Sequence, residues 1–222
     1  MYTDAGVTRV ASDGDLIYQI DNKGTRGDAA IQATLAKRPE YKTNLYNGNS
    51  AGRWDGIDDA LQAANVSVDG YFTWYVVGKF TTGSGYMLVE HSANWTVTNG
   101  MAFYGSSGSP IGVERADVGR GIAGVANWMG AALASVSTSF DGATNNDLEY
   151  FKDGVAQTKG SVSPAGDPAD STYTDTLNIG ARNAASVFSN GDFCEVIGFS
   201  QRHDAETRQL VWDYLKEKWG TP

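Results

Sequence analysis

The sequence predicts an all-β fold, an antiparallel β-sandwich of two sheets with one α-helix at its C-terminal end. Three observations support this prediction. The 222 residues include 27 glycines and only 19% charged residues, a composition typical of short strands joined by many turns. Residues 71–80 place large apolar side chains at every second position, and residues 204–219 show helical spacing. No linker, repeat or low-complexity segment divides the chain, so we expect a single domain over residues 1–222.

The strand signals are short and are separated by turn residues. In residues 71–80, Phe72, Trp74 and Val76 share one face, as expected for a sheet with one core face. Asp153-Gly154 is a strong hairpin turn after residues 147–152. Residues 26–36 are expected to form a loop or a short helical turn, and residues 157–175, with two prolines, a loop. The other expected strands are residues 16–20, 52–56, 86–90, 101–104, 132–140, 177–180 and 193–199.

A helix is expected over about residues 204–219. Asp204 is a suitable N-cap, Glu206 lies in the first turn and Gly220 is placed to end the helix. An apolar stripe predicts that this helix packs against the sandwich as a structural element. The stripe consists of Leu210, Val211, Tyr214, Leu215 and Trp219. Trp212 lies off this stripe and is expected to be exposed. The tryptophans predicted to lie in the core are Trp54, Trp74 and Trp219.

Charge and cysteine content argue against several functions. The net charge is −9 and no Lys/Arg cluster is present, so we expect no nucleic-acid partner. Cys194 is the only cysteine, and His91 and His203 are far apart in sequence, so neither a disulfide framework nor a zinc site is expected. No apolar run approaches the roughly 18 residues of a membrane span, and the N-terminus lacks the pattern of a signal peptide.

Four segments occur in a specific order along residues 15–220. They are Gln32-Ala-Thr34 followed by Lys37-Arg-Pro-Glu-Tyr41; Arg53-Trp-Asp-Gly-Ile-Asp-Asp-Ala-Leu61; Asn178-Ile-Gly-Ala-Arg182; and Gly191-Asp-Phe-Cys-Glu-Val-Ile197 with the terminal Tyr214-Leu-x-x-Lys-Trp-Gly220. In this order and spacing, the chain resembles the concanavalin A-like jelly rolls of the laminin-G-like superfamily, in their bacterial and phage branch. Residues 94–140 do not match the family pattern.

The resemblance implies a jelly roll of two antiparallel sheets, usually a noncatalytic module that binds glycans or proteins. Similar sequences occur in phage particles and in large bacterial surface proteins. Family members usually begin with a strand carrying a Trp-x-Asp-Ala-like segment, which here is shortened, absent or supplied by another chain. We therefore expect an open sheet edge near the N-terminus, and such an edge is suited to docking.

Asp55, Asp58 and Asp59 lie close enough in sequence to offer several carboxylate oxygens to calcium. The alternative is a turn in which short acidic side chains cap backbone amides. The resemblance favours the capping turn, so calcium remains the secondary interpretation. No other cofactor is expected.

Glu195 shares strand parity with Phe193 and Ile197, and a buried carboxylate at such a position is suited to acid–base catalysis. A glycosidase needs two carboxylates about 5–10 Å apart. The Glu-x-Asp-x-x-Glu-like strand of the jelly-roll glucanases is not present in this sequence. We therefore expect a buried structural glutamate paired with an arginine such as Arg182 or Arg208.

Trp95, Tyr104 and Trp128 lie in loop-rich or weakly patterned regions. Exposed aromatic rings of this kind stack on the apolar faces of sugar rings. The alternative is that these rings cap the core or lie in a subunit contact. Both interpretations stay open at this stage.

These observations predict a noncatalytic lectin-like module on a phage virion, either a capsid decoration protein or a tail appendage. A virion protein is made in the cytoplasm and needs no export signal. Its expected partners are other virion proteins or further copies of itself, with cell-surface glycans as ligands. The alternative is a carbohydrate-binding module of a larger bacterial surface or secreted protein. A glycoside hydrolase is the third and least favoured hypothesis.

Overall fold

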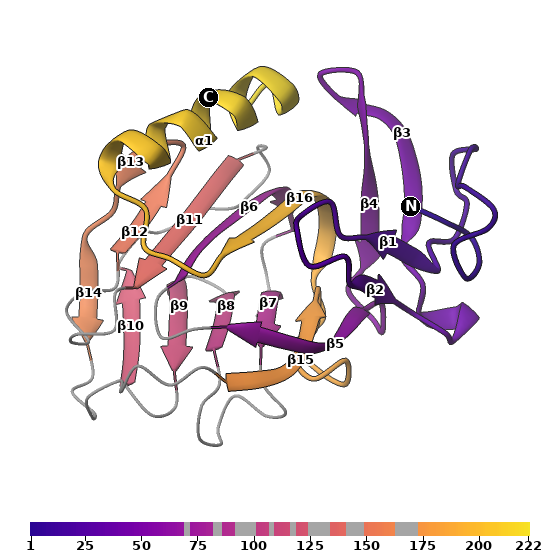
Figure 1. Ribbon diagram of the computed structural model, residues 1–222, viewed down its shortest axis with the longest axis horizontal. Coiled ribbons are helices and arrows are strands. Elements are labelled where there is room, and N and C mark those ends of the chain that lie inside the picture. Colours follow the sequence, from indigo (N-terminus) through magenta and orange to yellow (C-terminus); the bar gives the residue numbers. More distant parts are fainter. Residues whose placement is uncertain are drawn as a thin grey trace.

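The computed structural model describes residues 1–68, 72–81, 86–91, 101–106, 109–115, 119–123, 134–140, 149–162 and 173–222. These residues form two antiparallel sheets that are stacked face to face, and one α-helix that lies on the outer face of one sheet (Figure 1). The structure confirms the predicted two-sheet sandwich with a terminal helix. No helix among the residues described is long and apolar enough to cross a membrane.

Among the described residues, the larger sheet contains nine strands, and every neighbouring pair is antiparallel. In spatial order the strands are β1 (Gln19–Asp21), β2 (Ala29–Ile31), β5 (Leu61–Val68), β15 (Tyr173–Ile179), β7 (Tyr86–His91), β8 (Met101–Ser106), β9 (Ser109–Arg115), β10 (Gly119–Ala123) and β14 (Lys159–Val162).

In the part of the chain that the structure describes, the smaller sheet contains seven strands, again antiparallel throughout. In spatial order they are β13 (Val155–Ala156), β12 (Glu149–Lys152), β11 (Ala134–Phe140), β6 (Phe72–Phe80), β16 (Asn190–Phe199), β4 (Asn49–Asp55) and β3 (Glu40–Tyr46). A short 3₁₀ helix, Leu35–Lys37, precedes β3.

Three strand assignments from sequence are wrong. β2 lies in residues 26–36, where a loop or a short helical turn was expected, and only the end of this range forms such a turn, in the 3₁₀ helix Leu35–Lys37. β14 and the start of β15 lie in the expected loop of residues 157–175, and β1 begins at Gln19 rather than at residue 16. These segments are short, and most of their residues are polar or small, so they lack the alternating large apolar side chains that mark a strand in a sequence. Periodicity alone does not reveal such strands.

The main hydrophobic core lies between the two sheets. On β6, Phe72, Trp74 and Val76 point into this core and are at most 5% exposed. Trp54 from β4 lies there too, in ring contact with Phe193 at a centroid distance of 4.5 Å. The predicted core tryptophans of the strands are therefore confirmed.

β6 is buried on its other face as well, because α1 (Ala205–Trp219) covers it. Tyr75 and Val77 from β6 pack against Leu215 and Trp219 of the helix. The sequence predicts one core face for this strand, and the structure gives it two. The order of layers is therefore helix, seven-stranded sheet, nine-stranded sheet (Figure 1).

The helix begins and ends as predicted. The Asp204 carboxylate accepts a hydrogen bond from the Thr207 amide at 2.8 Å, and Gly220 ends the helix with φ of 71°. The predicted stripe, however, is partly wrong. Trp212 is buried against Phe151, whereas Leu210 and Tyr214 are 65% and 44% exposed. Trp212, Leu215 and Trp219 follow i, i+3, i+7 spacing, and this narrower stripe is the one that faces the sheet.

The expected open edge near the N-terminus is largely closed by the chain itself. Tyr2 exchanges backbone hydrogen bonds with Gln19 on β1, 2.8 and 3.2 Å long. Gly14 donates to the Tyr41 carbonyl and Ile17 to the Pro39 carbonyl, both at 2.8 Å, so the N-terminal segment also covers the outer side of β3. Short, irregular backbone pairing protects an edge that the sequence pattern leaves open.

Candidate functional site

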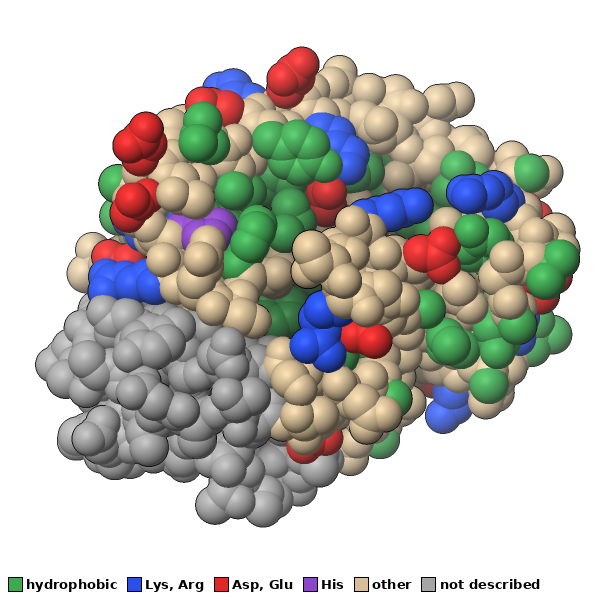
Figure 2. Space-filling view, in the orientation of Figure 1, with side chains coloured by type: hydrophobic (Ala, Val, Ile, Leu, Met, Phe, Trp, Pro, Cys, Tyr) green, Lys and Arg blue, Asp and Glu red, His purple; other side chains and the backbone are tan. Residues whose placement is uncertain are grey.

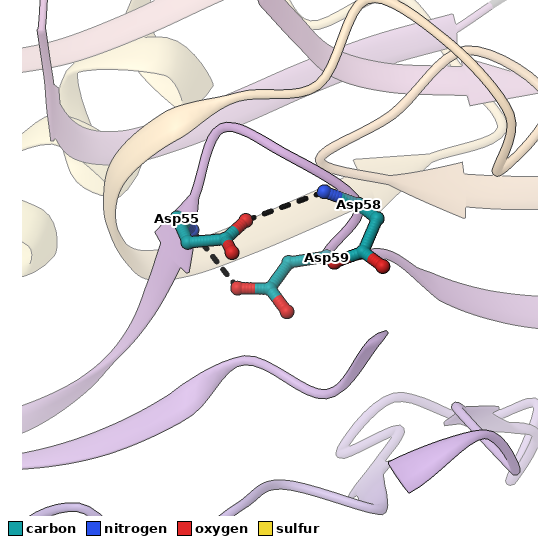
Figure 3. Close-up of side chains that lie close together, drawn as sticks. All are labelled: Asp55, Asp58 and Asp59. Atoms are coloured by element: carbon teal, nitrogen blue, oxygen red, sulfur yellow. Dashed lines mark hydrogen bonds between the residues drawn. The ribbon is translucent and has the colours of Figure 1, made fainter. Parts of the chain in front are cut away.

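The three aspartates predicted as a cation site or a capping turn lie together in the turn from β4 to β5 (Figure 3). One carboxylate oxygen from each residue lies within 4.8 Å of the others. Asp55 Oδ1 accepts hydrogen bonds from the amides of Ile57 at 2.8 Å and Asp58 at 3.3 Å. Asp59 Oδ2 accepts from the amide of Asp55 at 2.9 Å. Two of the three carboxylates therefore cap the backbone of their own turn.

The electrostatics of this turn are dominated by the burial of Asp59. Asp59 is only 5% exposed, and desolvation raises the pKa of its carboxyl to about 6. The hydrogen bond from the Asp55 amide opposes that rise, while the negative charges of Asp55 and Asp58 add to it. A hard cation would relieve the repulsion among these carboxylates. A proton on Asp59 relieves it as well.

The aromatic candidates fall in different places. Trp95 and Trp128 lie outside the described residues. Tyr104 is on β8 and is only 9% exposed, in a small cluster with Met87 and Ala102 and with half-buried Val187. Its ring is therefore part of a satellite core on the outer face of the nine-stranded sheet. It does not present an open stacking surface.

A polar row that sequence reasoning missed crosses the same outer face. Cross-strand register places Gln62, Asn178 and Glu90 side by side on β5, β15 and β7. Gln62 Nε2 donates to Asn178 Oδ1 at 2.8 Å, and Glu90 accepts a hydrogen bond from the Asn183 amide. Asn178 and Glu90 are fully buried. Only the pairing of strands distant in sequence brings these residues together, so no local motif signals them.

The loop after β15 covers part of this row and carries backbone strain. Asn183, Ala184 and Val187 have φ values of 47°, 47° and 51°, in the left-handed region that β-branched valine rarely adopts. The loop leads to Asn190, which pairs with Asp55 at the start of the aspartate turn. The turn itself needs Gly56, with φ of 79°, because a Cβ there would lie 2.7 Å from Asn190 Cβ. The strained loop and the aspartates therefore share one end of the sandwich.

Glu195 is held by α1 and is not paired with an arginine. Its carboxylate accepts from Tyr214 Oη at 2.8 Å, Lys218 Nζ at 3.0 Å and Trp219 Nε1 at 2.6 Å. The predicted partner Arg208 lies near the start of α1 and contacts Glu149 instead, at 3.3 Å. Glu195 lies beside the C-terminal end of α1, so its cationic partner is Lys218 of the last turn and not Arg208 near the start of the helix.

A β-bulge explains the parity error at Glu195. Cys194 is an extra residue in β16 relative to β6, because Phe193 pairs with Gly78 and Glu195 with Val77. Phe193 consequently points into the core, while Glu195 and Ile197 point toward the outer face and α1. Simple alternation would place all three on one face.

No protein-family model and no curated protein matches this sequence. The structure is similar to several solved structures. The Trypanosoma rangeli sialidase in complex with the inhibitor DANA has a TM-score of 0.56 at 10% identity, over 92% of this chain and 33% of that one. The botulinum neurotoxin serotype G binding domain has a TM-score of 0.53 at 9% identity, over 93% of this chain and 54% of that one. This chain thus spans about half the length of the neurotoxin domain.

A third solved structure is closer to this chain in size. Domain 4 of AbnA, an extracellular GH43 arabinanase from Geobacillus stearothermophilus, was determined in complex with arabinotriose. It has a TM-score of 0.50 at 9% identity, over 76% of this chain and 78% of that one. At identities this low, the structural similarity shows the fold alone, which is a jelly-roll β-sandwich.

Proposed function

We propose that this chain is a noncatalytic, lectin-like binding module on the surface of a phage virion. The observation that carries the proposal is the jelly-roll sandwich itself, which is shared with a domain determined in complex with arabinotriose. The module folds as one domain over residues 1–222. It recognises a glycan with one surface and docks on the particle with another.

The absence of catalysis in this proposal rests on Glu195. Three donors from α1 occupy its carboxylate, and Lys218 compensates its charge. A catalytic carboxylate must face a substrate, so that it can deliver a proton or attack a reacting atom. Glu195 instead fastens the helix to the sheet.

The glycan-binding residues of this proposal are Trp95 and Trp128. Tyr104 has no part in this proposal, because its ring is only 9% exposed and packs with Met87 and Ala102. The test is a glycan array probed with the isolated chain and with the variants Trp95→Ala, Trp128→Ala and Tyr104→Phe. We expect binding to fall with either tryptophan variant and to persist in Tyr104→Phe. Binding to no glycan, or binding that survives both tryptophan substitutions, refutes this assignment.

A carbohydrate-binding module of a larger surface or secreted protein is the second candidate. The similarity to domain 4 of an extracellular arabinanase favours it, since this domain is one part of a longer enzyme. Immunoblots of purified particles and of cell-surface fractions separate the two candidates. Signal in purified particles supports the virion module. Signal confined to the cell-surface fraction supports the second candidate.

A further inference from the structure

β16 changes from an interior strand to an edge strand along its length. Its register with β4 runs only from Asn190 to Phe193, whereas its register with β6 continues to Phe199. From Cys194 onward, no strand of the described residues pairs with the side of β16 that faces away from β6. The backbone N–H and C=O groups on that side lack a ladder partner.

The β3–β4 hairpin leaves β16 because its tip is bound to α1. Asn47 Nδ2 donates to the Glu217 carbonyl at 2.8 Å, and Asn49 Nδ2 donates to the Lys218 carbonyl at 2.5 Å. The bulge at Cys194 occurs where the two strands separate. Contacts that complete the end of the helix therefore leave the last part of β16 without a neighbour.

The surroundings of this free strand side are partly apolar and accessible. Gly198 and Ser200 are exposed, and the outward-facing Ile197 and Phe199 are only half-buried beside α1. Figure 2 shows hydrophobic side chains gathered in a hollow below the helix. Unpaired backbone groups next to half-exposed apolar side chains at alternate positions are what a docking strand requires.

We propose that the free side of β16, from Glu195 to Phe199, binds an extended segment of another protein, which adds to the seven-stranded sheet as an extra strand. The main-chain groups of β16 recognise the backbone of the segment, and Ile197 and Phe199 contact its apolar side chains at every second position. This docking surface lies on the seven-stranded sheet, and its tests measure peptide binding separately from glycan binding.

The geometry favours a foreign segment over a second copy of this chain. The hairpin tip around Asn47 closes one end of the free strand, and the chain turns into α1 beyond the other end. A second copy pairing through its own β16 would bring a second hairpin tip and a second helix into the same space. A single extended segment brings neither of these.

Hydrogen exchange measured by NMR on the wild-type chain tests the free edge without any substitution. Amides of alternate residues in 195–199 point toward β6 and away from it. We expect an alternating pattern, with slow exchange for the first set and fast exchange for the second. Uniformly slow exchange along these residues would show that the side is already paired and would overturn the proposal.

A displayed library of random nine-residue peptides tests the occupant. We expect the wild-type chain to select peptides with apolar residues at alternate positions, and these peptides to slow exchange of the fast amides. Ile197→Glu places a charge beside the docked strand and should weaken binding by at least about tenfold. The matched control is Val155→Glu, a charge at a 64% exposed valine on the edge strand β13, and it should leave binding unchanged.

Control measurements distinguish loss of peptide binding from unfolding and from self-association. Denaturant unfolding verifies that Ile197→Glu is folded, and Ser200→Pro, which removes one exposed donor after the strand, serves if it is not. The proposal is overturned if the selected peptides bind Ile197→Glu as tightly as they bind the control Val155→Glu. Self-association that Ile197→Glu abolishes in sedimentation identifies a second copy as the occupant and also overturns it. Loss of glycan binding in any variant bears on the proposed function and leaves this inference standing.

Discussion

Trp219 donates its indole N–H to the Glu195 carboxylate at 2.6 Å, so the last residue of α1 is fastened to the middle of β16. Lys218 and Tyr214 donate to the same carboxylate. A glutamate that resembles a catalytic residue in sequence thus serves as the anchor of the helix. Its position follows from the bulge at Cys194, which turns it toward α1.

Replacing this anchor should destabilise the fold. In Glu195→Gln the charge-assisted bonds from Lys218 and Trp219 are weakened, so we expect the free energy of unfolding to fall by about 1 to 3 kcal/mol. Urea unfolding followed by tryptophan fluorescence measures the change. Glu217→Gln, an exposed position on the same helix, is the control and should be nearly neutral. Equal effects of the two substitutions would contradict the anchoring role.

The two possible helix stripes predict opposite outcomes for two substitutions. Trp212→Ala removes a buried ring packed on Phe151 and should cost about 3 to 5 kcal/mol of stability. Leu210→Ala truncates a side chain that is 65% exposed and should change stability by less than about 0.5 kcal/mol. Thermal or urea unfolding distinguishes them. A large loss in Leu210→Ala would restore the stripe predicted from sequence.

Mild acid should destabilise the protein through its histidines. Burial lowers the pKa of His203, and the positive charge of Arg208 lowers it further; burial also lowers the pKa of His91. The unfolded chain, with a histidine pKa near 6.5, therefore takes up protons first as the pH falls. The contribution of the two histidines to the free energy of unfolding is fully present above about pH 6.5. It decreases below that pH, by at most about 1.4 kcal/mol per pH unit for each histidine. Unfolding curves at pH 7 and pH 5 measure the loss, which should be smaller in His203→Gln.

Asp59 should change the stability with pH in the direction opposite to the histidines. Its folded pKa of about 6 lies above the unfolded value of 3.8, so its ionisation disfavours the fold as the pH rises through this window. We expect Asp59→Asn, which keeps an acceptor for the Asp55 amide, to stabilise the protein at pH 7 by at most about 3 kcal/mol. The gain should vanish below about pH 4. Asp58→Asn serves as a control without a buried carboxylate.

Metal removal tests the remaining interpretation of the aspartate turn. Because the carboxylates of Asp55 and Asp59 already accept backbone hydrogen bonds, we expect EDTA and calcium chloride to leave the melting temperature unchanged. Differential scanning calorimetry provides the measurement. A calcium-dependent rise in melting temperature that Asp58→Asn removes would establish a cation site.

The sequence alone predicted the two-sheet sandwich and its terminal helix, because the patterns that indicate their strands, turns and helix caps are local. The alternation around Phe72 and Trp74, the Asp153-Gly154 turn and the Asp204 and Gly220 caps depend on neighbouring residues, and all appear in the structure. The capping turn at Asp55 belongs to the same class, since its hydrogen bonds span at most four residues.

Tertiary structure decided everything that depends on pairing between distant segments. The inserted residue Cys194 reverses the face of β16, so parity could not tell that Phe193 enters the core while Glu195 meets Lys218. Helix spacing allowed two stripes, and the ring of Phe151 on β12 selected the one that contains Trp212. The buried row of Gln62, Asn178 and Glu90 and the unpaired side of β16 arise from strand register. Register is set by packing and backbone hydrogen bonds across the whole sheet, which no local pattern encodes.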